Sequence, residues 1–201
     1  MPLLLAIDGR AGGGKTTLAA TINQAVSGSA VVHTDDIPTS DNWNGTDAYT
    51  PAPPATGPLP RSYFDWTERL LKNVLEPVRA GRAVRYRPPA WDDWAREGAI
   101  EVPSGCPMVI VEGVGTARLE LMHLIDVVVW VQSDVEQTET RAMVRDGGGA
   151  EAVAGWAAWK AEELPFLAAQ KPWERADFVV SGTPALEYDA ASQLVVATIH
   201  S

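Results

Sequence analysis

Long apolar runs, cysteines and basic residues are all scarce in this sequence of 201 residues. No apolar run approaches the ~20 residues that a bilayer crossing requires, so we expect no membrane partner. The single cysteine, Cys106, excludes an internal disulfide. Sixteen Lys and Arg against 26 Asp and Glu leave a net charge of −10. This excess of acid disfavours binding to nucleic acid or to an anionic membrane, since both need a basic surface.

The remaining composition is that of a globular protein. Hydrophobic residues make up 46% of the chain, which is ample for a packed core. Residues 1–8 lack the basic region of a signal peptide, so we expect a cytoplasmic protein. The length predicts one domain over residues 1–201, as a monomer or a homo-oligomer.

Short apolar runs alternate with segments of helical periodicity, which indicates βαβ units and a mostly parallel sheet. We predict strands at 3–7, 30–33, 108–111, 126–131 and 178–180, a further strand at 193–199, and helices at 15–26, 62–80, 134–146 and 150–170.

Two segments differ from this alternation. The loop at about 37–60 is rich in proline and has no Lys or Arg. A loop of this length in a compact domain is usually functional or disordered, and we assign it to the acceptor side. Gly147, Gly148 and Gly149 interrupt the two helices that follow residue 134, and we expect a helical lid at about 134–150.

The residues from Gly9 to Thr16 match the phosphate-binding P-loop, G-x-x-x-x-G-K-[ST]. Its glycines let successive backbone N–H groups point at phosphate oxygens, the lysine reaches the β- and γ-phosphates, and the threonine hydroxyl is a ligand for Mg²⁺. An apolar strand precedes the motif and a helix follows it, as the P-loop requires. We therefore predict ATP and Mg²⁺ as ligands. The predicted nucleotide-binding residues are Gly9, Gly12, Gly13, Gly14, Lys15, Thr16 and Thr17.

Carboxylates follow two of the predicted strands. Glu112 ends the strand at 108–111, where a carboxylate can hold Mg²⁺ directly or through water. Asp35 and Asp36 follow the strand at 30–33. Because parallel strands end at one sheet edge, we expect these acids, together with Asp8, to face the phosphates. We predict Thr16, Asp35 and Glu112 as metal residues; a strand-end acid or a turn cap remains the alternative.

Arg141 and Arg145 are four residues apart, so they share one face of a helix. Two guanidinium groups just before a glycine hinge are suited to neutralise the charge of a transferring phosphoryl group. The alternative is an exposed face that pairs with neighbouring acids.

In these features the sequence resembles the uridine kinase group of P-loop small-molecule kinases, which is related to phosphoribulokinase and bacterial pantothenate kinase. The resemblance is carried by residues 6–17, 33–36, Phe64-Asp65, 111–113, Arg141-x-x-x-Arg145-Asp146 and 176–180. It implies a P-loop three-layer α/β sandwich with a mostly parallel, five-stranded sheet, and transfer of the ATP γ-phosphate to a hydroxyl. By this resemblance Asp35 is the catalytic base, Lys15, Arg141 and Arg145 are catalytic, and Asp65 binds the acceptor.

The acceptor side is rich in aromatic residues. Flat side chains that suit a ring ligand are Trp43, Tyr63, Trp66, Tyr86, Trp91 and Trp94, although a core aromatic is the alternative for each. We assign Asp36, Asp65, Tyr86 and Trp91 to the acceptor. Nearby basic residues are few, which favours a neutral hydroxyl acceptor over a nucleoside monophosphate. A nucleotide-binding switch or partner-regulated ATPase is the alternative of another class; the N-K-x-D motif of GTPases and the LSGGQ signature of ABC ATPases are both absent.

Overall fold

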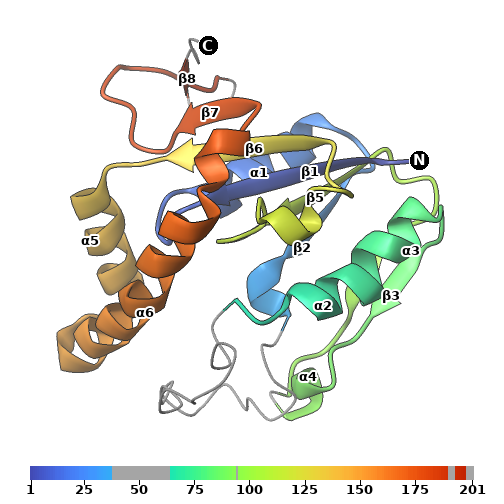
Figure 1. Cartoon of the computed structure of the whole chain (residues 1–201), viewed down its shortest axis with the longest axis horizontal. Coiled ribbons are helices and arrows are strands. Elements are labelled where there is room, and N and C mark those ends of the chain that lie inside the picture. Colours follow the sequence, from blue (N-terminus) through green and yellow to red (C-terminus); the bar gives the residue numbers. More distant parts are fainter. Residues whose placement is uncertain (38–63, 94, 190–192, 198–201) are drawn as a thin grey trace.

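A six-stranded sheet forms the centre of the molecule, in the order β2-β5-β1-β6-β7-β8 (Figure 1). The structure is a computed structural model, and it describes residues 1–37, 64–93, 95–189 and 193–197. All but one residue of the predicted loop at 37–60 therefore lies outside the described residues. The strands are β1 (Leu3–Gly9), β2 (Ala30–His33), β5 (Met108–Glu112), β6 (Val127–Gln132), β7 (Phe178–Ser181) and β8 (Val196–Ala197).

Five of these strands run parallel, as the sequence predicts, and the mostly parallel α/β fold is confirmed. The predicted number of five strands is wrong, because β8 adds a sixth. This strand pairs antiparallel with β7, with Val179 opposite Ala197 and Val180 opposite Val196.

The helices are α1 (Lys15–Ala25), α2 (Thr67–Leu70), α3 (Glu76–Arg79), α4 (Ala90–Asp93), α5 (Val135–Arg145) and α6 (Gly149–Gln170). Apart from α4, which was not predicted, and the first residue of α6, they fall within the predicted segments. A π-helical turn, Leu71–Leu75, joins α2 to α3. Within the described ranges, no helix combines the length and apolar character that crossing a membrane needs.

Side chains that alternate along the strands pack on opposite faces of the sheet. On one face, Leu5 and Ile7 of β1 pack with Leu18 of α1. On the other face, Leu4 of β1 shares a core with residues of α2, the π-helical turn and α3. Helices therefore cover both faces, and the layered sandwich is confirmed.

A second, two-stranded sheet was not predicted. β3 (Val84–Tyr86) and β4 (Ile100–Val102) pair antiparallel. β3 was not predicted because residues 82–87 have the composition of a basic stretch and not of an apolar strand. The buried side chains at Val84, Ile100 and Val102 join the core beneath α2 and α3. α4 lies in the connection between β3 and β4, on the predicted acceptor side.

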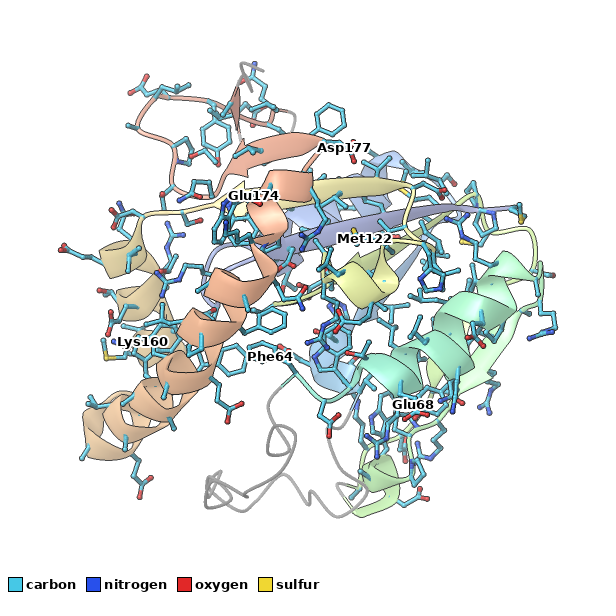
Figure 2. All side chains as sticks on the ribbon, viewed as in Figure 1. Phe64, Glu68, Met122, Lys160, Glu174 and Asp177 are labelled. Carbon is cyan, nitrogen blue, oxygen red and sulfur yellow. The ribbon has the colours of Figure 1, made fainter. Side chains whose placement is uncertain are left out.

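The helices α5 and α6 lie side by side at one end of the sheet (Figure 1). Gly147, Gly148 and Gly149 between them all have positive φ, at 86°, 67° and 83°. Residues with a Cβ rarely adopt this region, which accounts for three consecutive glycines. Lys160 of α6 forms an ion pair with Glu139 of α5 at 2.5 Å and ties the two helices together (Figure 2).

We predict that Leu70→Ala lowers the free energy of unfolding by about 2–5 kcal/mol, because it leaves a cavity in the fully buried core. The matched control is Leu119→Ala, whose side chain is largely exposed, and it should stay within about 0.5 kcal/mol of wild type. Urea denaturation of both variants measures the difference. Equal losses in the two variants would contradict the assigned core.

Candidate active site

The predicted P-loop connects β1 to α1 at the carboxyl edge of the sheet. Gly14 precedes α1 in the left-handed region, at φ 96°, and a Cβ there would meet open space. The first turn of α1 has no side-chain cap and no acidic residue. Thr16 and Thr17 are exposed in that turn. Free N–H groups, positive helix polarity and an exposed hydroxyl together make a site for an anion such as a phosphate group.

Lys15 is almost fully buried at the centre of this loop. Its Nζ donates a hydrogen bond to the Arg10 carbonyl at 2.9 Å, and the same carbonyl accepts the Gly13 N–H at 3.0 Å. The loop therefore curls around its own lysine. The ammonium is thereby held against the backbone of the P-loop.

Other parts of the chain fix the backbone of the P-loop from outside. Ser133, which follows β6, donates from Oγ to the Gly13 carbonyl at 2.8 Å. A Cβ at Gly12 would lie 2.5 Å from the Thr138 carbonyl oxygen of α5, so only glycine allows this approach. Glu163 of α6 accepts the Ala11 N–H at 2.9 Å. Sequence patterns missed Ser133 and Glu163, since both reach the loop across more than 100 residues.

Glu112 lies next to the P-loop at the end of β5, as predicted. Its Oε1 accepts the Thr16 hydroxyl at 3.0 Å and lies 2.6 Å from His33 Nδ1. Burial alone would raise the pKa of Glu112, but the His33 hydrogen bond, the Lys15 charge and the Thr16 hydrogen bond together lower it. The Glu112 hydrogen bond in turn raises the pKa of His33. Glu112 is thus kept as a carboxylate, and its partner His33 was not predicted.

Asp35 lies in the 3₁₀ turn Thr34–Asp36 that follows β2. Surrounding protein atoms restrict the hydration of its carboxyl and raise its pKa, whereas the positive charges of Lys15 and Arg145 lower it. The residue as a whole is nevertheless exposed. A carboxylate with a raised pKa has the properties of a general base.

The oxygen donors Thr16, Asp35 and Glu112 fit the preference of Mg²⁺ for hydroxyl and carboxylate oxygens. Over the described ranges, no three His, Cys, Asp or Glu side chains gather closely enough to hold a metal by themselves.

Asp36 and Trp91, both predicted to bind the acceptor, contact each other and other residues of the protein. Trp91 is 3% exposed and donates its Nε1–H to the Asp36 carbonyl at 2.9 Å. The Arg96 guanidinium pairs with the Asp36 carboxylate at 2.6 Å and lies 3.9 Å from the centre of the Trp91 ring. Trp91 therefore belongs to the core and contacts the Asp36 backbone, which corrects its expected place on the ligand surface.

The other acceptor-side residues are divided between surface and core. Asp65 is exposed in the turn before α2, whereas Tyr86 is partly buried against the core. Phe64 stacks on Phe166 of α6, with ring centroids 4.3 Å apart (Figure 2). Arg118 is buried and donates to the Phe64 carbonyl at 2.7 Å, a contact that the sequence did not predict. Of the aromatic set, Trp66 is also buried, and Trp43, Tyr63 and Trp94 lie outside the described residues.

The two predicted lid arginines have different surroundings. Arg145 ends α5, forms an ion pair with Asp146 at 2.7 Å, and is close enough to Asp35 for their charges to interact. Arg141 donates instead to the Gly182 carbonyl at 3.2 Å. The structure therefore brings Arg145, but not Arg141, towards the proposed base.

Asp8 does not face the phosphates, which corrects the expectation drawn from its place at the strand end. It is fully buried and accepts the N–H groups of Gly9, Gly115 and Ala117 at 2.7, 2.9 and 2.9 Å. Burial raises its pKa, and these three hydrogen bonds oppose the shift. Its role is to hold the loop after β5 against the end of β1.

The fold matches that of solved kinase structures. No protein-family model matches the sequence, and no curated protein matches it. A "possible uridine kinase" from Bacillus stearothermophilus is similar in structure, with a TM-score of 0.57, 25% identity and coverage of 89% of this chain and 88% of that one. A "putative fructose transport system kinase" from Silicibacter sp. has a TM-score of 0.61 at 22% identity, over 84% and 85% of the two chains.

These comparisons confirm the resemblance to uridine kinase-like P-loop kinases. They support a small-molecule kinase in general terms.

We predict that Gly113→Ala displaces the turn that carries Asp35. A Cβ at Gly113 would lie 1.8 Å from Thr34 Oγ1, and its φ of 151° is itself unfavourable for alanine. Gly81→Ala is the control, because Gly81 also has a positive φ (72°) but nothing within 4 Å of a new Cβ. Thermal denaturation should show that Gly113→Ala loses more free energy of unfolding than Gly81→Ala does, by roughly 1–3 kcal/mol. Equal losses of free energy in the two variants would mean that the positive φ, and not the contact with Thr34, causes the effect.

Proposed function

We propose that the protein is an ATP-dependent kinase that transfers the γ-phosphate of ATP to a hydroxyl of a neutral, nucleoside-like small molecule. One observation carries the proposal: the buried Lys15 of the P-loop and the carboxyl of Asp35 lie at the same sheet edge, close enough for their charges to interact. The P-loop residues Gly9, Gly12, Gly13, Gly14, Lys15, Thr16 and Thr17 would bind the nucleotide phosphates.

In this proposal Asp35 accepts the proton of the acceptor hydroxyl as the oxygen attacks the γ-phosphorus. Its raised pKa improves it as a base relative to an ordinary aspartate, and the Lys15 and Arg145 charges oppose the rise and favour the ionised form. Lys15 and Arg145 balance the negative charge of the phosphoryl group, and we assign Arg141 to the same role. Phosphoryl transfer depends on such positioning and charge balance.

Mg²⁺, when bound, would balance phosphate charge, held by Thr16 and assisted by Asp35 and Glu112. The ion pair with His33 keeps Glu112 deprotonated and orients it towards the Thr16 hydroxyl. This arrangement of the protein's own groups supports the magnesium assignment.

Ion pairing on the acceptor side supports a neutral acceptor. Arg85 pairs with Glu101 at 3.1 Å, Arg87 with Asp92 at 2.7 Å and Arg96 with Asp36 at 2.6 Å. An acceptor phosphate would have to compete with these carboxylates. We assign Asp36, Asp65 and Tyr86 to the acceptor, and Trp91 acts only through its hydrogen bond to the Asp36 carbonyl. One kinase domain over residues 1–201, a lid at 134–150 and a cytoplasmic location are parts of the same proposal.

The experiment that tests this function is an ADP-release screen with Mg²⁺·ATP. Acceptors should include nucleosides, nucleoside monophosphates, sugar alcohols and hydroxylated vitamins. We expect release that depends on a neutral hydroxyl compound. Release with nucleoside monophosphates alone would point to a monophosphate kinase, and release independent of any acceptor would point to an ATPase or switch. Both results contradict the proposal.

We predict that Lys15→Ala abolishes phosphorylation and weakens ATP binding, because the ammonium that reaches the phosphates is removed. Lys72→Ala is the matched control, since Lys72 is exposed and pairs only with Glu68 on its own helical segment among the contacts described. It should keep wild-type turnover. Titration calorimetry with ATP and the ADP-release assay measure both properties. Full turnover in Lys15→Ala would remove the P-loop from the mechanism.

We predict that Asp35→Asn lowers kcat by at least ~10²-fold while ATP affinity is retained, as expected for loss of a positioned base. In the wild type, activity requires ionised Asp35, so kcat/KM should fall as the pH drops through a pKa above the ordinary value of 3.8. The variant should lack this acidic limb. Unchanged kcat, or an unchanged pH profile, would exclude Asp35 as the base.

A further inference from the structure

Glu163 is a fully buried carboxylate in the middle of α6, in a chain that already carries excess negative charge. Burial of a carboxylate is costly unless hydrogen bonds and an opposite charge compensate it. Here both partners belong to the P-loop. Oε1 accepts the Ala11 N–H at 2.9 Å, and Oε2 lies 3.4 Å from Nη2 of Arg10. The buried charge is thus directed at the phosphate site and not at solvent.

The Ala11 N–H belongs to the same peptide group as the Arg10 carbonyl. Glu163 therefore holds one end of this peptide, while Lys15 Nζ and the Gly13 N–H hold the other end at 2.9 and 3.0 Å. Rotation of the peptide plane would break both sets of contacts together. Since Glu163 takes the Ala11 N–H, it also fixes which N–H groups of the loop remain for phosphate.

The same loop contacts α5 through the close approach of Gly12 to the Thr138 carbonyl. Glu139, the next residue, pairs with Lys160 of α6, three residues before Glu163. The base of the α5–α6 pair is therefore fixed to the P-loop at two points. Arg145, at the far end of α5, lies near Asp35.

We infer that Glu163 is a positioning residue of the phosphate site: it orients the Arg10–Ala11 peptide and thereby joins the P-loop and the α5–α6 pair into one unit. This inference rests on the proposed nucleotide-binding function and deepens it. Glu163 acts through Arg10 and Ala11 and does not itself touch the nucleotide. A simple stabilising contact would change the unfolding temperature without changing ATP affinity in the folded protein.

The test compares Glu163→Gln with wild type by ATP titration calorimetry at a temperature where circular dichroism shows both to be folded. Glutamine keeps the shape but loses the charge that holds Arg10. We expect ATP affinity to fall roughly tenfold or more, with KM for ATP rising more than kcat falls, because small misplacements of binding groups have large effects. The control, Glu151→Gln, replaces an exposed acid of the same helix and should bind ATP as wild type does.

A double-mutant cycle locates the effect in the P-loop. If Glu163 acts through Arg10, the losses of ATP-binding free energy in Arg10→Leu and Glu163→Gln should be clearly non-additive in the double variant. ATP affinity within twofold of wild type in folded Glu163→Gln would overturn the inference. Should that variant not fold, Arg10→Leu carries the test, and its unchanged ATP affinity would overturn the inference equally. Failure of wild type to bind ATP would instead contradict the proposed function, so the two failures are distinguishable.

Discussion

The buried Lys15 ammonium and its hydrogen bond to the Arg10 carbonyl are the interaction on which the rest of the site depends. A buried cation needs compensation, and the protein provides it with a backbone carbonyl and with the nearby charges of Asp35 and Glu112. Because parallel strands end at one edge, the sheet brings these groups together from β1, β2 and β5. The order of the strands thus explains why residues far apart in sequence can share one charge balance.

The net charge of −10 is compatible with binding a polyanion once the positions of the charges are known. In the proposed site, backbone N–H groups would supply much of the phosphate recognition, and net charge does not count them. Several acids are already compensated: Asp8 by three backbone N–H groups, Glu163 by the P-loop, and Asp36 by Arg96. Asp35 and Glu112 remain beside the phosphate site, where a magnesium ion would balance them.

Local patterns were sufficient to predict the P-loop, the five parallel strands and the break between α5 and α6, because neighbouring residues specify these features. Long-range contacts could not be predicted. In the sequence, nothing distinguishes Glu163 from the other acids of an Ala-rich helix. Its role depends on how α6 packs against the P-loop. Asp8 was misplaced for the same reason, because the loop that it binds follows β5 about a hundred residues later. Trp91 gave no signal that separates a core aromatic from a ligand-binding one.

The central claim is that this sheet edge transfers the γ-phosphate of ATP to a neutral hydroxyl. The most direct measurement is the fate of the label when the protein is incubated with Mg²⁺ and ATP labelled at the γ-phosphorus, together with the acceptors active in ADP release. We expect label in a stable phosphate monoester of the acceptor. Label found only in inorganic phosphate would contradict it.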